Sequence, residues 1–483
     1  MRETGSTLFI HGAWQAALDH RTFEVCDASD GTVIGAASDA GAEETDRSIA
    51  AAAAAFPAWS GATAYQRAAV LRTAHVLMME RLEELAALMT REQGKPLKAA
   101  RNEVRYAADF LAWFSEEATR VYGRTIPSSR ADQRLSVLRQ PLGVVAGITP
   151  WNYPISMITR KVAPAVAAGC TMVLKPAEQT PLCAVAVFEI LAEAGLPPGV
   201  ANLVTTARPD VVGDRLLGSP IVRKLTFTGS TEVGKMLAAR AATTMKRVSM
   251  ELGGHAPLIV FEDADPEHAA KGTALVKFLN TGQACISPNR IYVHRSIVRA
   301  FTDALVTRVE KLQVGPGSRE GVSIGPLVDE AALDKVSRQV RDAVAKGATV
   351  LTGGTRLTEG ELQRGRFFAP TVLVDVDETM DIYREETFGP VAPVIVFDDE
   401  IEVVRRANDT EYGLASYLYT RDLGRAVRVS EALRFGIVGI NDINPTAAAA
   451  PFGGIGASGL GREGGSEGID DYLDVKLVGL VLP

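Results

Sequence analysis

The spacing of apolar residues changes near residue 142, and this change predicts where helices give way to sheets. Over residues 71–89, the residues of one face recur at steps of three and four, which is the period of an α-helix. Thr63 and Gln66 match a capping box at the start of this helix, and Gly94 matches a stop signal. We therefore expect the first hundred or so residues to be helical.

From Leu142 onward, short apolar runs alternate with amphipathic stretches. The runs GVVAGI, CTMVLKP, VANLVTT and KLTFTG are separated by segments of helical period, and a second alternation of this kind follows Gly253. Runs that are apolar at every position are typical of parallel strands covered by helices on both faces. The pattern predicts an α/β protein with two doubly wound α/β domains that meet near Gly253.

Two strand-like pieces lie outside both alternations. They are residues 124–140 and the tail YLDVKLVGLVL. We interpret them as a projecting β arm, which predicts a contact between subunits of a homo-oligomer.

Composition narrows the class of protein. The chain has 483 residues, of which 47% are hydrophobic and 23% charged, and its formal net charge is −7. This balance is typical of a core-forming globular protein, and an acidic chain offers no basic field for nucleic acid. No uncharged apolar run reaches the roughly 18 residues that cross a bilayer, and the start MRETGSTLFIHGAW lacks the apolar core of a signal peptide. We therefore expect a cytoplasmic protein with neither a nucleic-acid nor a membrane partner.

The four cysteines are too few and too scattered for a disulfide scaffold. Cys170 and Cys183 lie inside apolar runs, as small buried residues do. Cys285 instead lies in the loop GQACISPNR after a predicted helix, and an accessible thiolate in such a loop is a nucleophile. Glu251 ends a predicted strand beside two glycines, which allow close approach of a ligand. The six histidines show no ligand spacing, so no metal site is expected.

Polar loops follow three further strand ends, where a parallel sheet opens its ligand crevice. In TPWNYP, two prolines stiffen the loop around Asn152, whose amide suits an oxygen that gains negative charge, or simply a turn. In LKPAEQTP, Lys175 and Glu178 suit ribose hydroxyls or a surface ion pair. FTGSTEVG leads through Gly229 and Ser230 into a helix N-terminus, which suits a phosphate or a plain helix cap.

Taken together, these loops resemble the aldehyde dehydrogenase superfamily over essentially the whole chain. The motifs, in the family's order, are TPWNYP, LKPAEQTP, FTGSTEVG, MELGGHAP, GQACISPNR, EETFGP and PFGGIGASGLGREGG. Within it, the chain is most similar to the succinate-semialdehyde dehydrogenases, through MITRKVAPAVAAGCTMVLKPAEQTP, IGPLVDE and GIVGIN. The resemblance implies a homodimer or homotetramer. We divide the chain into a dinucleotide-binding domain (residues 1–122 and 142–252), a catalytic domain (253–453), and an oligomerisation arm with a C-terminal tail (123–141 and 454–483).

The resemblance also implies a mechanism. Cys285 matches the catalytic thiol, Glu251 the general base, and Asn152 the side-chain donor of an oxyanion hole. Lys161 and Glu463 match residues that support the site or relay protons. The thiolate attacks the aldehyde, hydride leaves to the nicotinamide, and the resulting thioester is hydrolysed by water that the base activates.

The implied cofactor is NAD, with NADP possible. Glu178 would accept a hydrogen bond from the 2′-hydroxyl of the adenosine ribose and would repel a 2′-phosphate. The positions that match dinucleotide contacts are Thr149, Pro150, Trp151, Asn152, Lys175, Pro176, Ala177, Glu178, Gly229, Ser230, Val233, Leu252, Glu386 and Phe388.

The substrate pocket matches the succinate-semialdehyde enzymes only in part. Arg160 matches one arginine for a substrate carboxylate, but a second arginine position is Leu279, and the family's carboxylate-binding serine falls near Thr446 or Ala447. Tyr153 and Ile286 are the other expected pocket residues. We expect a carboxylated semialdehyde such as succinate semialdehyde, with a broader aromatic or aliphatic range as the alternative.

Three other functions are possible for such a chain. Transfer of the acyl group to coenzyme A does not need a water-activating base, so Glu251 argues against it. A non-catalytic NAD-binding scaffold does not need Cys285, Glu251 and Asn152 together. A cofactor-independent cysteine hydrolase leaves the dinucleotide loops without a purpose.

Overall fold

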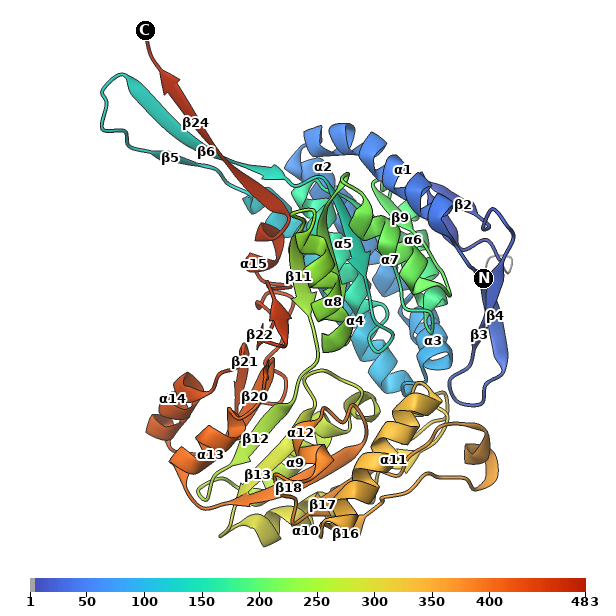
Figure 1. Cartoon of the computed structure of the whole chain (residues 1–483), viewed down its shortest axis with the longest axis vertical. Helices are drawn as coiled ribbons and strands as arrows, with labels where there is room; N and C mark the ends of the chain where they lie inside the picture. Colours follow the sequence, from blue (N-terminus) through green and yellow to red (C-terminus); the bar gives the residue numbers. More distant parts are fainter. Residues whose placement is uncertain (1–4) are drawn as a thin grey trace.

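The computed structural model describes residues 5–483 and places the two alternations of the sequence in two separate sheets (Figure 1). The first sheet has eight strands, in the order β2, β1, β9, β8, β7, β10, β11 and β23. Its central strands, from β9 to β11, pair in parallel, while β1, β2 and β23 pair antiparallel at the edges. The strands are β1 (Leu8–Ile10), β2 (Ala13–Gln15), β7 (Val144–Ile148), β8 (Thr171–Lys175), β9 (Ala201–Leu203), β10 (Val222–Thr228), β11 (Arg247–Glu251) and β23 (Gly459–Leu460).

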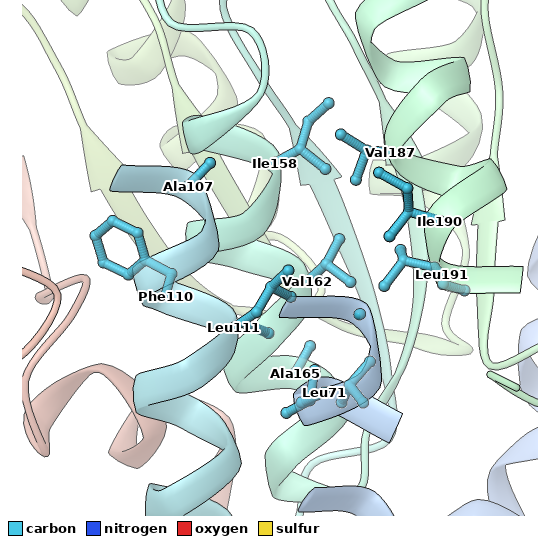
Figure 2. Close-up of a cluster of buried hydrophobic side chains, with 14 of the residues drawn as sticks. Leu71, Ala107, Phe110, Leu111, Ile158, Val162, Ala165, Val187, Ile190 and Leu191 are labelled. Atoms are coloured by element: carbon cyan, nitrogen blue, oxygen red, sulfur yellow. The ribbon is translucent and has the colours of Figure 1, made fainter. Parts of the chain in front are cut away.

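Helices cover both faces of this sheet. On one face, a buried cluster joins the strands to α1 (Ala42–Gly61), α7 (Pro209–Gly218) and α8 (Thr231–Ala242). On the other face, a larger apolar cluster gathers between helices, and Figure 2 shows Leu71, Leu111, Val162 and Leu191 converging in it. These helices are α2 (Ala64–Glu80), α3 (Leu82–Gln93), α4 (Leu97–Glu117), α5 (Ser156–Ala168) and α6 (Pro181–Glu193).

The second sheet has seven strands, in the order β16, β17, β18, β13, β12, β20 and β21, and only β16 runs antiparallel to its neighbour. Helices again cover both faces. The strands are β12 (Ala256–Val260), β13 (Pro288–His294), β16 (Thr349–Thr352), β17 (Thr371–Val374), β18 (Val391–Phe397), β20 (Ala415–Tyr419) and β21 (Ile437–Ile440). The helices are α9 (Pro266–Lys277), α10 (Val298–Val309), α11 (Glu330–Ala345), α12 (Asp381–Arg384), α13 (Glu400–Ala407) and α14 (Leu423–Ala432). The prediction of two doubly wound α/β domains is confirmed.

A third, small sheet projects from the first domain (Figure 1). It consists of β24 (Leu473–Val481), β6 (Gln133–Pro141) and β5 (Arg124–Ile126), in that order and antiparallel throughout. All residues of β24 after Leu473 are exposed, including the apolar Val475, Leu477 and Leu480. Between the arm and the second domain, β22 (Ile455–Gly456) pairs with β19 (Tyr412–Gly413), and a short helix α15 (Glu467–Asp470) precedes β24.

The prediction of a helical first hundred residues is wrong at its beginning. Residues 8–38 form four strands, because β1 and β2 extend the edge of the first sheet and β3 (Thr22–Cys26) pairs with β4 (Val33–Ser38). Each of these strands has three to six residues, too few for alternation to be visible in the sequence. The capping box of Thr63 and Gln66 is confirmed, but the helix it starts breaks at Arg81.

The remaining strands are β14 (Gln313–Val314) and β15 (Val322–Ile324), which pair with each other. Within residues 5–483, none of the helices combines the length and apolar character needed to cross a membrane. The same residues contain no group of three or more His, Cys, Asp or Glu side chains that could hold a metal ion.

Candidate active site

The four polar loops singled out in the sequence meet at the carboxyl ends of central strands of the first sheet. They follow β7, β8, β10 and β11, whose carboxyl ends lie side by side because the strands are parallel and adjacent. Hydrogen bonds tie the ends together: the Thr149 amide donates to the Lys175 carbonyl at 3.1 Å, and the Gly229 amide donates to the Glu251 carbonyl at 3.1 Å. Open α/β sheets bind ligands in the crevice at the carboxyl ends of their strands.

The thiol loop comes from the second domain and is joined directly to the Asn152 loop. Cys285 lies between α9 and β13, after a short turn in which Asn280 and Thr281 have the positive φ angles 50° and 61°. The Asn152 side chain donates through Nδ2 to the Gln283 carbonyl at 3.0 Å, and Asn280 Nδ2 donates to the Asn152 carbonyl at 2.9 Å. These two hydrogen bonds therefore connect the loop of the proposed oxyanion donor, in the first domain, to the loop of the proposed nucleophile, in the second domain.

Cys285 is less accessible than the sequence suggests. It is partly buried and packs against the apolar core of the second domain. Burial raises the pKa of its thiol to about 12, the nearby Arg160 guanidinium lowers it, and the carboxyls of Glu251 and Glu386 raise it further. The resting group is therefore a thiol, and a base must take its proton before it can attack.

Glu251 is the candidate for that base, since its carboxyl interacts electrostatically with the thiol. It is the last residue of β11, its side chain is buried, and neither carboxyl oxygen has a hydrogen-bond partner among the described residues. Burial, reinforced by the negative charge of Glu463, raises its pKa well above the ordinary value of 4.5. A carboxyl group with a raised pKa and free oxygens is suited to exchange a proton with a bound reactant.

Lys161 and Glu463 form a buried ion pair behind Glu251. Lys161 Nζ also donates to Thr226 Oγ1 at 3.1 Å. Burial disfavours the charged carboxylate of Glu463, but Lys161 and Arg160 outweigh burial and lower the pKa of this group. Glu463 therefore stays ionised beside the proposed base.

Arg160 has two sets of neighbours. Its Nε lies 3.0 Å from Glu463 Oε2, and its guanidinium lies over the Phe452 ring at 4.1 Å from the centroid. Its Nη1 lies 3.6 Å from Met157 Sδ, and its buried Nη2 has no hydrogen-bond partner among the described residues. Arg160 is thus engaged by a carboxylate of the protein, its Nη2 is left without a hydrogen-bond partner in the described part of the chain, and its charge lowers the pKa of the Cys285 thiol.

The other expected pocket residues are spread around this centre. Tyr153 is partly buried beneath Lys95, Ile286 adjoins the thiol, and Leu279 is 41% exposed. The Thr446 hydroxyl donates to Asn444 Oδ1 at 3.0 Å. These positions place one guanidinium and mainly apolar or neutral groups near the thiol loop.

The crevice residues fit a dinucleotide. Ser230 caps the twelve-residue helix α8 by accepting from the Val233 amide at 3.3 Å, so the positive end of the helix faces the crevice. A side chain at Gly229 would clash with the Phe227 ring, which keeps the backbone there open to close approach. Lys175 forms an ion pair with Glu178, whose side chain is 32% exposed. The Lys175 ammonium, the Glu178 carboxylate and the N-terminus of α8 thus offer hydrogen-bond donors and acceptors that suit a ribose and a pyrophosphate.

The far side of the crevice comes from the second domain. Glu386 Oε1 accepts from the Gly254 amide at 2.9 Å, and the Phe388 ring meets Trp151 edge-on at 5.6 Å between centroids. A cavity of about 730 Å³ between the domains is lined by Ser230 and Glu386 among others. The other expected contacts lie on or beside the same strand ends and are Pro150, Pro176, Ala177 and Leu252.

Sequence reasoning missed three residues near this site. Lys95 and Glu103 form a buried ion pair behind the Asn152 loop. The Tyr106 phenol interacts electrostatically with Arg160 and Cys285, and burial raises its pKa. Only weak signals were available: a Gly-Lys-Pro at a helix start, with Glu103 and Tyr106 on one face of that helix.

Comparisons with known proteins agree with this geometry. A family model described as the aldehyde dehydrogenase family matches residues 14–478. The chain is 52% identical to a glutarate-semialdehyde dehydrogenase of Pseudomonas putida, over 97% of this chain and 96% of the relative. It is 51% identical to the NADP⁺-linked succinate-semialdehyde dehydrogenase of Escherichia coli, over 99% of each chain.

A solved structure is equally similar. The crystal structure of succinate-semialdehyde dehydrogenase from Burkholderia pseudomallei superposes with a TM-score of 0.97 at 48% identity, covering 100% of this chain and 98% of that chain. This likeness covers both sheets and the arm of the chain.

Proposed function

Because the chain belongs to the aldehyde dehydrogenase family, we propose that Cys285, Asn152 and Glu251 are the groups with which it oxidises an aldehyde to a carboxylic acid. One observation carries the assignment: the Asn152 amide is hydrogen-bonded into the Cys285 loop. The Glu251 carboxyl, which has no hydrogen-bond partner among the residues described and is close enough to raise the pKa of the thiol, supports it.

The chain's own groups account for the proton and charge movements. Glu251 takes the proton of the Cys285 thiol, and the sulfur then bonds to the aldehyde carbon while the carbonyl electron pair moves to oxygen. The Asn152 amide donates to that oxygen, with the Cys285 backbone N–H as second donor. Bound NAD(P)⁺ supplies the hydride acceptor. The carbon–hydrogen bond would then break, with its electron pair leaving as hydride, so that the carbonyl re-forms and the acyl group is held on Cys285 as a thioester. Glu251, after releasing the thiol proton, takes a proton from water, whose oxygen bonds to the acyl carbon and displaces the Cys285 sulfur as thiolate. Lys161 and Glu463 would carry protons away from Glu251.

The cofactor site is proposed at the strand ends of the first sheet. Lys175 and Glu178 would hold the adenosine ribose, Ser230 the pyrophosphate at the α8 N-terminus, and Glu386 the second ribose. Glu178 supports a preference for NAD, since its carboxylate would repel a 2′-phosphate. The relative from Escherichia coli is named as NADP⁺-linked, so the preference must come from local residues rather than from the family.

We propose a carboxylated semialdehyde of four or five carbons as the substrate class. Two similar relatives are named for the semialdehydes of succinate and glutarate, and Arg160 offers a buried cation whose Nη2 has no hydrogen-bond partner within the described chain and whose charge acts on the thiol. Leu279 and Thr446 add no charge, which favours one salt bridge to the substrate carboxylate rather than several. A longer or less polar aldehyde is the second candidate, favoured by the partly exposed Leu279.

We also propose that the chain works as a homo-oligomer in the cytoplasm. The exposed apolar residues of β24 support a subunit contact through the arm. The separate sheets support the division into a cofactor domain, a catalytic domain and an arm, except that β23, in the range assigned to the C-terminal tail, joins the first sheet. Transfer to coenzyme A is the enzymatic alternative, and the presence of Glu251 as a water-activating base argues against it.

Replacement of Cys285 tests the proposal. Cys285→Ser should abolish aldehyde-dependent NADH formation, because a serine hydroxyl lacks the acidity and nucleophilicity of the thiol. Mass spectrometry of the wild type, quenched during turnover, should detect an acyl adduct on the Cys285 peptide, and added coenzyme A should yield no acyl-CoA. Undiminished oxidation by the variant, or an adduct on another peptide, would contradict the assignment.

A further inference from the structure

A fully buried ion pair lies directly behind the loop that carries Asn152. Lys95 precedes α4, and Glu103 lies in its second turn; their residues are 1% and 3% exposed. Lys95 Nζ donates to the backbone carbonyl of Asn152 at 2.8 Å. The steps proposed above use neither residue.

The pair holds both ends of the Asn152 loop. Glu103 Oε2 pairs with Lys95, while Glu103 Oε1 accepts from the backbone amides of Ile155 at 3.0 Å and Ser156 at 3.2 Å. Between these two points, the Lys95 ammonium lies over the Tyr153 ring at 4.1 Å from its centroid. Residues 152–156 are therefore bound at their start, middle and end by the same two side chains.

The Asn152 carbonyl is fixed from two sides. It accepts from Lys95 Nζ in the first domain and from Asn280 Nδ2 in the thiol loop of the second domain. A carbonyl oxygen has two lone pairs, so both are used. The Asn152 side chain in turn donates to the Gln283 carbonyl, two residues before Cys285. The distance between oxyanion donor and thiol thus depends on where Lys95 holds the backbone.

Stability alone is a poor reason for such a pair. Removing two charges from water costs several kcal/mol per ion, and apolar residues of similar volume are often as stabilising. The surrounding α4 and α5 already pack through an apolar cluster. An apolar pair would, however, leave the Asn152 carbonyl and the amides of Ile155 and Ser156 without these partners.

We propose that Lys95 and Glu103 are positioning residues, which act through the Asn152 backbone to hold the oxyanion donor at the Cys285 sulfur. This inference rests on the proposed role of Asn152. Its central consequence is that loss of Lys95 should matter only while the Asn152 amide is present.

A double-mutant cycle tests this dependence. The working variant is Lys95→Met in a Glu103→Gln background, which leaves no unpaired buried charge and keeps an oxygen for the Ile155 and Ser156 amides. We expect kcat to fall about 10- to 100-fold with little change in the KM for aldehyde, because a misplacement near 1 Å has effects of this size. In an Asn152→Ala background, the same change should lower kcat less than about threefold.

A matched variant separates positioning from general damage. Lys224→Met removes another fully buried lysine, which lies near Asp471 and Tyr472 and does not contact Asn152. Its effect on kcat should be the same with and without Asn152.

Hydrogen exchange gives a readout that does not depend on turnover. In Lys95→Met/Glu103→Gln, backbone amides of residues 152–156 should exchange faster than in the wild type, while those of β10 should be unchanged. Should this double variant not fold, as judged by circular dichroism, Lys95→Arg enters the same cycle. Arginine replaces the point donor by a planar fork, so a kcat loss that disappears in the Asn152→Ala background is again expected.

The outcomes are separable. If the losses from Lys95→Met/Glu103→Gln and Asn152→Ala simply multiply, Lys95 has a structural role and the inference is wrong. If Asn152→Ala itself leaves kcat unchanged, the proposed oxyanion role of Asn152 has failed instead.

Discussion

The two ends of the crevice contain the same kind of ion pair in different surroundings. At the thiol end, Lys161 and Glu463 are buried, with side chains 0% and 4% exposed, and Glu251 beside them is also buried. At the end proposed for adenosine, Lys175 is buried but the Glu178 side chain is 32% exposed. Charges interact far more strongly where water is excluded.

This difference shows which property each end controls. At the thiol end, burial sets the protonation states, raising the pKa of Cys285 to about 12 and that of Glu251 well above its ordinary value. At the adenosine end, solvent screens the carboxylate, so the pair is suited to modest discrimination between ligands rather than to proton transfer. Substitutions should therefore have larger effects at the thiol end.

The largest effect is expected from Asn152→Ala. Loss of one oxyanion donor in a buried site should lower kcat on the order of 10²–10³-fold. Steady-state NADH formation measures the loss, and Asn202→Ala, which alters a buried asparagine in β9 outside the crevice, is the control. Activity of Asn152→Ala within twofold of the wild type would exclude this role and weaken the contrast between the two ends.

A smaller, substrate-dependent effect is expected from Arg160→Ala. A hydrogen bond to a charged group contributes about 1.5–3 kcal/mol, so KM for an ω-carboxylated aldehyde should rise roughly 10- to 100-fold. KM for a neutral aldehyde of equal length should change little, whereas kcat for both will fall if the contact with Glu463 matters. An equal rise in KM for both aldehydes would remove the carboxylate from the proposed substrate.

The smallest effect is expected from Glu178→Ser at the exposed end. It should increase the ratio of kcat/KM for NADP to that for NAD by roughly tenfold, since a screened repulsion is worth about 1 kcal/mol and Lys175 becomes available to a phosphate. Glu189→Ser, which changes a carboxylate on α6, serves as the comparison. An unchanged ratio would mean that Glu178 does not face the 2′ position.

The sequence predicted those helices and strands that a run of neighbouring residues reveals, and it missed those that are too short to show a period. The strands β7, β8 and β10 are visible as apolar runs because helices bury both their faces, and Glu251 and Cys285 are visible because they interrupt such patterns. The four strands between residues 8 and 38 are too short to show a period. The break at Arg81 has no proline or glycine to announce it.

Within the candidate site, the sequence singled out residues whose loops the structure brings together, but it did not predict their surroundings. The loop placement of Cys285 suggested an accessible thiolate, whereas its packing on the second domain makes it a thiol with a raised pKa. Lys95 and Asn152 are 57 residues apart in the chain, and nothing local marks their contact. Such contacts come from the packing of α4 against α5, which only the three-dimensional arrangement supplies.

The turn before Cys285 bears on attempts to raise the thermal stability of this protein. Asn280 and Thr281 both hold left-handed backbone angles, and each such residue costs on the order of 1–3 kcal/mol. Glycine at either position would relax the turn and also release the side chains that brace it, Asn280 on Asn152 and Thr281 on Gly325. Substitutions intended to raise the thermal stability should therefore avoid this turn and be sought elsewhere in the chain.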